Sequence, residues 1–345
     1  MIVFDGPVTP DALTTFVREV PTPADQVLNQ LLPDRLFNKN SIDFAELTRT
    51  NRTARFRAYD GRLHVSERDT ELTKTVKLPP LSTSLSTGEL ERLNLEFART
   101  GGTNNAALID AIYDDATNLT REVQARMEQA RGDVLTDGKF TLAGEGGLFL
   151  EADFGVPANH FVAPGVLWSN TASATIIANL SAWIDIYVAT NGFAPGGMAI
   201  SRRILNYMLQ NAELRTLAAS IVGTPGLITR PGLDAALGAY GLPPIQMVYD
   251  TVVDVDGTST RVIPDDRVIF VPPNVTDLGY TAWGVTATSL ELVNSNQADL
   301  SFSQAPGIVG VVEKSGPPYR EFTYVDAVGM PVLANPKLLM IADVA

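Results

Sequence analysis

KLPPLSTSLSTGELERLNLEFARTGG, residues 77–102, joins a basic segment to an acidic one. Residues 51–80 contain seven basic and four acidic side chains, a net charge of +3. Residues 81–155 contain six basic and thirteen acidic side chains, a net charge of −7. Complementary charges on two surfaces of one chain would let a loop of one copy lie across a helix of the next. The pattern therefore predicts self-assembly.

Composition limits the class of protein. The chain has 345 residues, 45% of them hydrophobic and 19% charged, which is typical of a folded protein with a sizeable core. It contains no cysteine, so disulfides and thiolate metal sites are excluded. A formal charge of −13 disfavours wrapping of nucleic acid, which needs basic surface.

No segment is predicted to span a membrane or to direct secretion. Charged residues and proline interrupt the apolar runs of the first 20 residues. The most apolar long window, residues 174–188, is too short and too polar to cross a bilayer.

The N-terminal third is predicted to be extended. Residues 1–50 are expected to form an arm with a short helix that opens at Pro10 and a second short piece over residues 27–32. Residues 51–60 alternate between polar and apolar side chains and predict a strand, and residues 71–78 predict the returning strand. Because a two-stranded ribbon is marginal alone in water, it needs a partner surface.

Two helices are expected next. Ser86 and Glu89 match a capping box, which predicts a helix start there. A longer helix is predicted over residues 104–131, with Gly132 ending it. The face opposite its apolar stripe carries acidic side chains that are solvated or available to a cationic partner: Asp110, Asp114, Asp115, Glu122 and Glu128.

The rest of the chain predicts a hairpin, a hinge at residues 155–171 and a mixed α/β region. The hairpin pairs residues 139–143 with residues 148–154. Helices are expected at 174–190, 201–219 and 231–240, and strands at 245–254, 259–263, 267–271, 307–313, 321–328 and 337–344. The first of these helices should pack on strands 245–254 and 267–271.

We predict no catalytic, cofactor-binding or metal site. The two histidines, His64 and His160, lack the partners that a general base or metal ligand needs. Residues 132–139, GDVLTDGK, miss the phosphate-loop pattern because the glycines are one residue too far apart and Phe140 replaces the required Ser or Thr. An enzyme with an α/β domain at residues 174–306 is the outside alternative, but that region has no catalytic constellation.

Five motifs in collinear order reach from one end of the chain to the other: SIDFAELTRTNRTARFRAYDGRLHV (41–65), KLPPLSTSLSTGELERL (77–93), VLTDGKFTLAGEG (134–146), LGYTAWGVTATSLEL (278–292) and YVDAVGMPVLANPKLLMIADV (324–344). With them the chain resembles the major capsid proteins of tailed bacteriophages. More narrowly, it resembles the phage major capsid protein E family, that of the coliphage lambda major head protein.

The resemblance implies an α+β chain with the HK97-like phage capsid fold. The implied parts are an N-terminal arm (1–50), an extended E-loop (51–86), a P-domain with a long spine helix and β-hairpin (87–160), an A-domain (161–306) and returning P-domain strands (307–345). The E-loop of one copy would lie over the P-domain of the next. Its candidate contacts to the acidic helix face are Arg52, Arg55, Arg57, Arg62, Arg68, Lys74 and Lys77.

The implied function is that of a head protein, not an enzyme, whose hexamers and pentamers form an icosahedral shell around double-stranded DNA. The implied partners are a separate scaffolding protein, a portal and a cementing or decoration protein; DNA is enclosed non-specifically, and no membrane is involved. The implied location is the virion, after assembly in the host cytoplasm. The alternative is an encapsulin-type compartment shell.

Some relatives join a loop lysine to an asparagine of a neighbouring subunit. Lys74, Lys77 and Asn335 supply these residue types. Such a bond also needs a carboxylate base beside both groups, and the lambda-like family is not known for this chemistry. We therefore predict noncovalent contacts between subunits.

Overall fold

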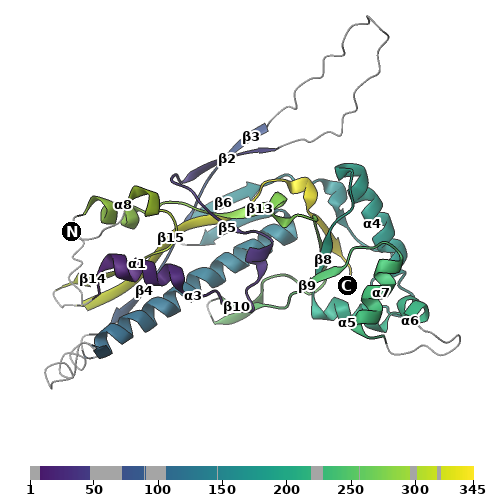
Figure 1. Ribbon diagram of the computed structural model, residues 1–345, viewed down its shortest axis with the longest axis horizontal. Helices are drawn as coiled ribbons and strands as arrows, with labels where there is room; N and C mark the ends of the chain where they lie inside the picture. The colour runs from purple at the N-terminus through teal and green to yellow at the C-terminus, as the bar shows by residue number, and fades with distance from the viewer. Residues whose placement is uncertain are drawn as a thin grey trace, which may run out of the picture.

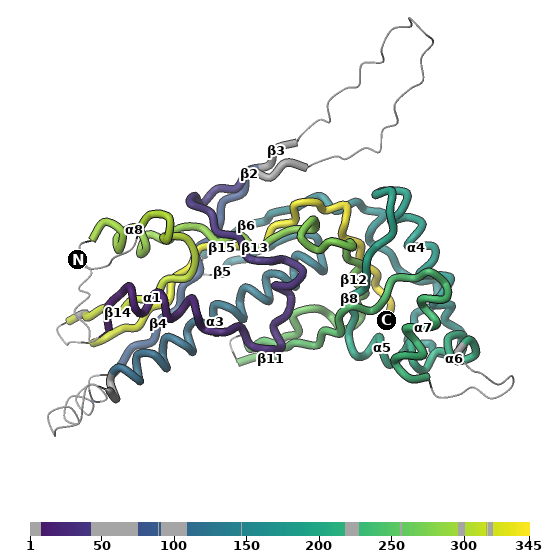
Figure 2. Tube along the Cα trace, viewed as in Figure 1, coloured from purple at the N-terminus to yellow at the C-terminus, as the bar shows by residue number. Residues whose placement is uncertain are grey.

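Two five-stranded sheets and one long helix form the body of the chain in the computed structural model shown in Figures 1 and 2. The structure describes residues 8–46, 72–88, 90, 106–145, 147–218, 228–255, 257–295, 301–316 and 320–345. Several sequence predictions lie outside these ranges: the strand at 51–60, His64, and the cations Arg52, Arg55, Arg57, Arg62 and Arg68.

The first sheet combines strands from both ends of the chain. Its order is β1-β13-β15-β14, and β4 also pairs with β15. The strands are β1 (Asp34–Leu36), β4 (Pro80–Thr87), β13 (Gly279–Trp283), β14 (Val309–Ser315) and β15 (Arg320–Leu333). β1 runs parallel to β13, so the N-terminal arm is part of this sheet.

The arm packs on the first sheet. The predicted helix forms as α1 (Pro10–Glu19), and the second piece forms a 3₁₀ turn, η1 (Leu28–Gln30). Leu13 and Val17 of α1 are buried, and Thr14 Oγ1 donates a hydrogen bond of 3.1 Å to the carbonyl of Gly310 in β14.

The long helix is α3 (Ala106–Asp137), 32 residues and about 48 Å long. It packs against β15 and β4 of the first sheet and continues to the second sheet (Figure 1). The apolar stripe that the periodicity predicts is buried at Ile112, Leu119, Val123, Met127 and Ala130.

Gly132 does not end α3, so that prediction is wrong. A Cβ added at Gly132 would lie 2.3 Å from the carbonyl oxygen of Val262. The glycine is therefore a point of close approach between the helix and the connection from β11 (Thr258–Arg261) to β12 (Arg267–Val271). The helix ends at Asp137, and Gly138 follows it with a φ of 66°, the left-handed conformation that favours glycine.

The second sheet has the order β7-β16-β12-β8-β9. Its strands are β7 (Phe161–Val162), β8 (Gly197–Ile200), β9 (Ile245–Val248), β12 (Arg267–Val271) and β16 (Met340–Asp343). α4 (Ile176–Asn191) packs on β12, as predicted for residues 267–271: the rings of Trp183 and Phe270 are in edge contact, with their centroids 6.3 Å apart. The predicted strand at 245–254 is divided, and only its first part, β9, belongs to this sheet. The predicted helix at 201–219 is split at Asn211 into α5 (Arg202–Gln210) and α6 (Ala212–Ala218).

The remaining elements are short helices and two-stranded ribbons. The helices are α7 (Arg230–Ala239) and α8 (Ala287–Asn294). β5 (Lys139–Glu145) and β6 (Leu148–Asp153) form the predicted hairpin, while β10 (Val252–Val255) and β11 (Thr258–Arg261) form another. β2 (Ser41–Glu46) pairs with β3 (Leu72–Lys77), and this ribbon projects from the body (Figures 1 and 2).

The predicted helix start at Ser86 is wrong, because Ser86 lies in β4. Residues 80–87 pair antiparallel with residues 321–328 of β15, and Ser86 lies opposite Phe322. The capping-box pattern is a local signal, and pairing with a strand from the other end of the chain overrides it.

The two sheets divide the chain differently from the predicted domains at two strands. β13 belongs to the first sheet although it falls within residues 161–306. β16 pairs with β12 of the second sheet, so the expectation that the closing strands all return to the first sheet is wrong for β16. Each sheet is therefore assembled from separate parts of the sequence.

We expect Gly132→Ala to lower the free energy of unfolding of the isolated subunit by about 1–3 kcal/mol, because the new methyl group meets backbone that must shift. Urea denaturation measures this. Gly238→Ala in α7 is the matched control: a Cβ there meets nothing within 4 Å, so helix propensity should raise stability by up to about 1 kcal/mol. Equal effects at both sites would contradict the close approach.

Candidate functional site

A buried carboxylate, Glu128 of α3, joins three parts of the fold. Its side chain is fully buried. Oε1 accepts hydrogen bonds from the backbone N–H of Leu28 in the arm, at 2.8 Å, and from the hydroxyl of Tyr249, at 3.1 Å. Oε2 accepts from Arg131, at 3.2 Å. A buried charge is costly unless it is paired and hydrogen-bonded, and these partners offset the cost of burying Glu128.

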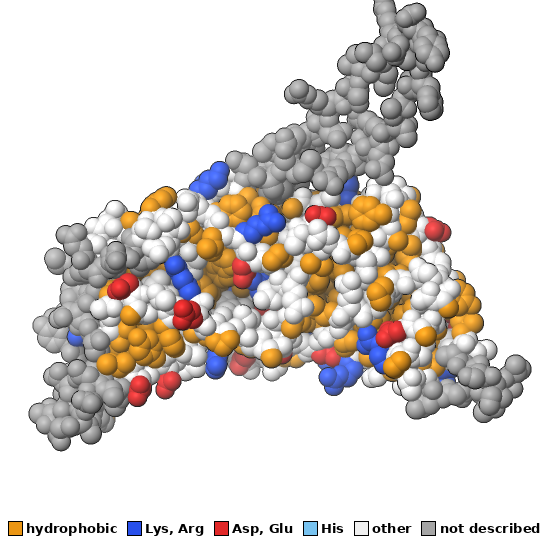
Figure 3. All heavy atoms as spheres, in the orientation of Figure 1, with side chains coloured by type: hydrophobic (Ala, Val, Ile, Leu, Met, Phe, Trp, Pro, Cys, Tyr) orange, Lys and Arg blue, Asp and Glu red, His pale blue; other side chains and the backbone are white. Residues whose placement is uncertain are grey.

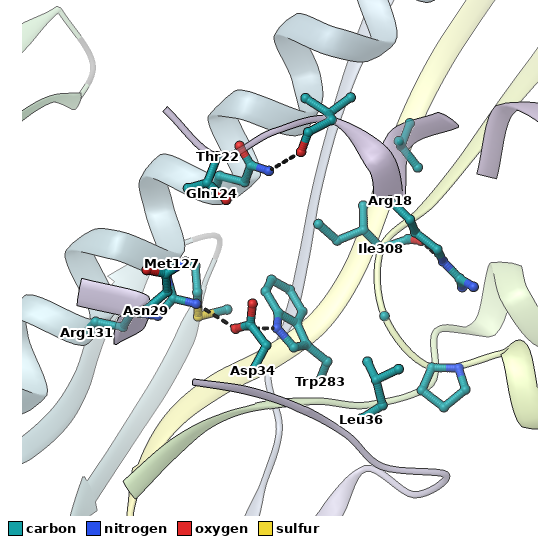
Figure 4. Close-up of a pocket in the computed structure, with 14 residues that line it drawn as sticks. Arg18, Thr22, Asn29, Asp34, Leu36, Gln124, Met127, Arg131, Trp283 and Ile308 are labelled. Atoms are coloured by element: carbon teal, nitrogen blue, oxygen red, sulfur yellow. Dashed lines mark hydrogen bonds and ion pairs between the residues drawn. The ribbon is translucent and has the colours of Figure 1, made fainter. Parts of the chain in front are cut away.

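Arg131 extends this cluster to the first sheet. Its side chain is 5% exposed. It donates to Oγ1 of Thr281 in β13, at 2.8 Å, and to Oδ1 of Asp34 in β1, at 2.6 Å. Asp34 Oδ1 also accepts from the indole N–H of Trp283, at 2.9 Å (Figure 4). The guanidinium therefore links α3 to two adjacent strands.

Tyr249 reaches this cluster from the second sheet. It follows β9, and its backbone N–H donates to the carbonyl of Ile200 at the end of β8, at 2.8 Å. Burial, with the negative charge of Glu128, raises the pKa of Tyr249. The hydroxyl therefore stays protonated and donates to the carboxylate.

The cluster corrects one sequence prediction. Glu128 was expected on the solvated face of the helix, available to a neighbouring copy, but it is buried and bonded within its own chain. Sequence reasoning also missed Arg131, Asp34 and Tyr249. The i,i+3 spacing of Glu128 and Arg131 is a signal for the pair, but nothing local identifies the other partners.

A groove of 290 Å³ lies beside the cluster, between the arm and α3 (Figure 4). Arg18 of α1 donates to the carbonyl of Ile308, at 2.9 Å, and Gln124 of α3 donates to the carbonyl of Val20, at 3.2 Å. Leu36, at the edge of the sheet, is 63% exposed. The Asp34 side chain, 51% exposed, is the part of the cluster that meets solvent here.

The other predicted acidic side chains lie nearer the start of α3. Asp110, Asp114 and Glu122 are exposed, and Asp115 is half-buried. Glu122 already accepts a hydrogen bond of 2.7 Å from Thr83 Oγ1 of β4. Of the predicted cations, Lys77 at the end of β3 is exposed, and the backbone of Lys74 pairs with Phe44 in the projecting ribbon. The described residues therefore include exposed acidic side chains on α3 and an exposed cation, Lys77, on the projecting ribbon.

The visible face of the molecule carries its charges singly and in small groups among apolar and neutral side chains (Figure 3). No cluster of three or more residues suited to holding a metal ion occurs in the described ranges. In the same ranges, no helix combines the length and apolar character needed to cross a membrane. His160 is buried, with Nδ1 2.8 Å from the carbonyl oxygen of Leu339, and burial lowers its pKa.

Solved structures of phage-related proteins share this architecture. The chain is similar to the putative capsid protein of a prophage of Escherichia coli CFT073, with 15% identity, a TM-score of 0.64 and coverage of 98% of this chain and 99% of that one. It is also similar to a phage-related protein of Bordetella bronchiseptica RB50, with 14% identity, a TM-score of 0.54 and coverage of 98% of both chains. No curated protein sequence matches the chain.

The long helix, the arm, the projecting ribbon and the two sheets define an HK97-like phage capsid fold. The sequence family described as phage major capsid protein E matches residues 9–344. The chain belongs to this family, whose members are structural proteins and not enzymes.

We expect Glu128→Ala to lower the free energy of unfolding by about 3–5 kcal/mol, because it leaves Arg131 buried with one partner fewer and the Leu28 N–H unpaired. Urea denaturation of the subunit measures the loss. Glu122→Ala, the same change at an exposed position of the same helix, should cost no more than about 1 kcal/mol. A small loss at Glu128 would contradict the mutual dependence of the buried charges of Glu128 and Arg131.

The partly buried carboxyl group of Asp133 in α3 should make the stability of the subunit depend on pH. Burial raises the pKa of its carboxyl from 3.8 to about 6, and the attraction of Arg126 only partly opposes this. The folded chain therefore binds this proton more tightly than the unfolded chain, so its contribution to stability falls as pH rises from about 4 to 6.

Asp133→Asn should remove this decline. The variant should match wild type below about pH 4 and exceed it by about 1–2 kcal/mol above pH 6, after allowance for partial exposure. Urea midpoints across this range test it. Asp110→Asn, which removes an exposed carboxylate from the same helix, is the control. A constant offset between Asp133→Asn and wild type at every pH would refute the prediction.

Proposed function

We propose that this chain is the head subunit of a tailed bacteriophage, forming hexamers and pentamers that close into an icosahedral shell around double-stranded DNA. Membership of the phage major capsid protein E family carries the proposal and favours it over an encapsulin-type shell. The virion is its location, after assembly in the host cytoplasm. Its partners are further copies of itself, a separate scaffolding protein, a portal and a decoration protein.

The projecting ribbon of β2 and β3 supports contact between copies. A two-stranded ribbon is marginal by itself in water, so a surface outside the body must stabilise it. We infer that it continues into the E-loop and lies over the P-domain of the next copy, where the exposed side chains of Asp110, Asp114 and Glu122 are available to its cations.

Electron microscopy of the purified protein, with its absorbance ratio for nucleic acid, tests the proposal. Closed shells that contain DNA when produced with the phage packaging components are expected. Shells that hold a cargo protein in place of DNA would favour the encapsulin alternative. A stable monomer by sedimentation, in the presence of scaffolding protein, would overturn both.

We expect Arg55→Glu with Arg57→Glu to slow assembly roughly tenfold, since complementary charge speeds association, and raised salt to slow wild type in the same direction. Light scattering follows the rate. The matched control, Arg55→Lys with Arg57→Lys, keeps the charge and should assemble near the wild-type rate. An unchanged assembly rate for the charge-reversed variant would show that these two cations do not contribute to the interface.

The contacts between subunits are proposed to be noncovalent. Mature particles boiled in denaturing detergent should therefore give one band near 37.1 kDa. A ladder of covalent multimers would instead implicate a crosslink, for which Lys74, Lys77 and Asn335 are the residues to replace first.

A further inference from the structure

We propose that the hydrogen bond between Glu128 and Tyr249 sets the angle between the two sheets and, through that angle, the curvature of the shell. The inference rests on the proposed function, since curvature has meaning only for a chain that forms a shell. It concerns how one subunit holds its own shape, which family membership does not specify.

The bond crosses between two bodies of the fold. Glu128 lies in the helix that packs on the first sheet. Tyr249 is tied to the second sheet through its backbone N–H to Ile200, at 2.8 Å, and its hydroxyl reaches Glu128 Oε1 at 3.1 Å. Glu128 is fully buried and Tyr249 is 4% exposed, so water does not compete readily for this bond.

Two further contacts near Tyr249 join segments next to the second sheet to the arm and to α3. Thr251 Oγ1 donates to the carbonyl of Asp25 in the arm. Gly132 of α3 lies against the backbone of Val262, with no room for a Cβ. The loop after β9 and the connection between β11 and β12 are thus held against the arm and α3 by these contacts, of which Tyr249 to Glu128 is the one to a charge, and by buried apolar side chains of the shared core, Val253 and Val262 among them.

The chain itself leaves the angle adjustable. It enters the second sheet from the β5–β6 hairpin through η2 (Ala158–His160), and it passes between the two sheets from β12 to β13 through η3 (Val275–Asp277) and from β15 to β16 through η5 (Pro336–Leu338). Such connections absorb backbone rotation, as hinges do. A hydrogen bond weakens steeply beyond about 3.5 Å, so the bond to Glu128 favours one narrow range of angles.

Tyr249→Phe in the full-length chain tests the inference, because it removes the hydroxyl and little volume. We expect the fraction of particles outside the wild-type diameter range to rise roughly tenfold in electron micrographs, as one lost charge-assisted bond can shift a ratio of states by that factor. Amide hydrogen exchange in residues 245–255 should quicken by a similar factor.

Tyr187→Phe is the matched control. Tyr187 of α4 is also fully buried, and its hydroxyl donates to the carbonyl of Leu338, at 3.1 Å. Leu338 is the last residue of η5, on the side of β16, so this bond joins α4 to the end of η5 at the second sheet and does not reach α3 or the first sheet. The two variants lose the same group, but only Tyr249→Phe breaks a bond between the two bodies. Diameters should stay at the wild-type distribution for Tyr187→Phe.

Wild-type diameters for Tyr249→Phe, or the same spread in both variants, would overturn the inference and leave the proposed function intact. Failure of wild type to form shells would instead overturn the proposed function. If Tyr249→Phe does not fold by circular dichroism, Thr251→Val gives the test, since it breaks the second crossing bond. It should broaden the diameters in the same direction, and unchanged diameters would overturn the inference.

Discussion

The carboxylate of Glu128 is the point at which the arm, the long helix and the second sheet meet. It accepts bonds from Leu28, Arg131 and Tyr249, and each partner comes from a different part of the sequence. Through Arg131 the same network reaches Asp34 and the first sheet. Glu128 and Arg131 each have hydrogen-bond partners in three segments of the chain, so this pair helps to hold those segments in their relative positions.

A buried ion pair is not in itself stabilising, because both charges lose their hydration. Here hydrogen bonds replace the lost hydration: the carboxylate and the guanidinium each have several hydrogen-bond partners, and Asp34 keeps contact with solvent. The arrangement is worth more for specificity than for stability. Hydrogen bonds require particular distances and directions, whereas the apolar contacts of α3 with β15 tolerate small shifts.

Local patterns predicted much of the fold. The apolar stripe of α3, the helix at α4 and the hairpin of β5 and β6 each follow from residues close together in the chain. The failures share a cause, which is a distant partner. Gly132 is a close approach to Val262 and not a helix end, Ser86 pairs with Phe322, and β16 joins the second sheet. The proposed capsid function came from motifs spread over the whole chain, which local patterns alone could not supply.

Glu128 shows why the exposed side chains of α3 could not be predicted from the sequence alone. It follows Asp110 by 18 residues, five turns of an α-helix, so the two side chains leave α3 in the same direction. Asp110 is nevertheless exposed, whereas Glu128 is fully buried. Helical periodicity predicts the direction in which a side chain leaves the helix but not which other segments pack there. The arm and Tyr249 cover only the C-terminal part of this face. Of the acidic side chains predicted to meet a neighbouring copy, the exposed ones, Asp110, Asp114 and Glu122, therefore lie between the start and the middle of α3, whereas Glu128 near its C-terminal end binds segments of its own subunit.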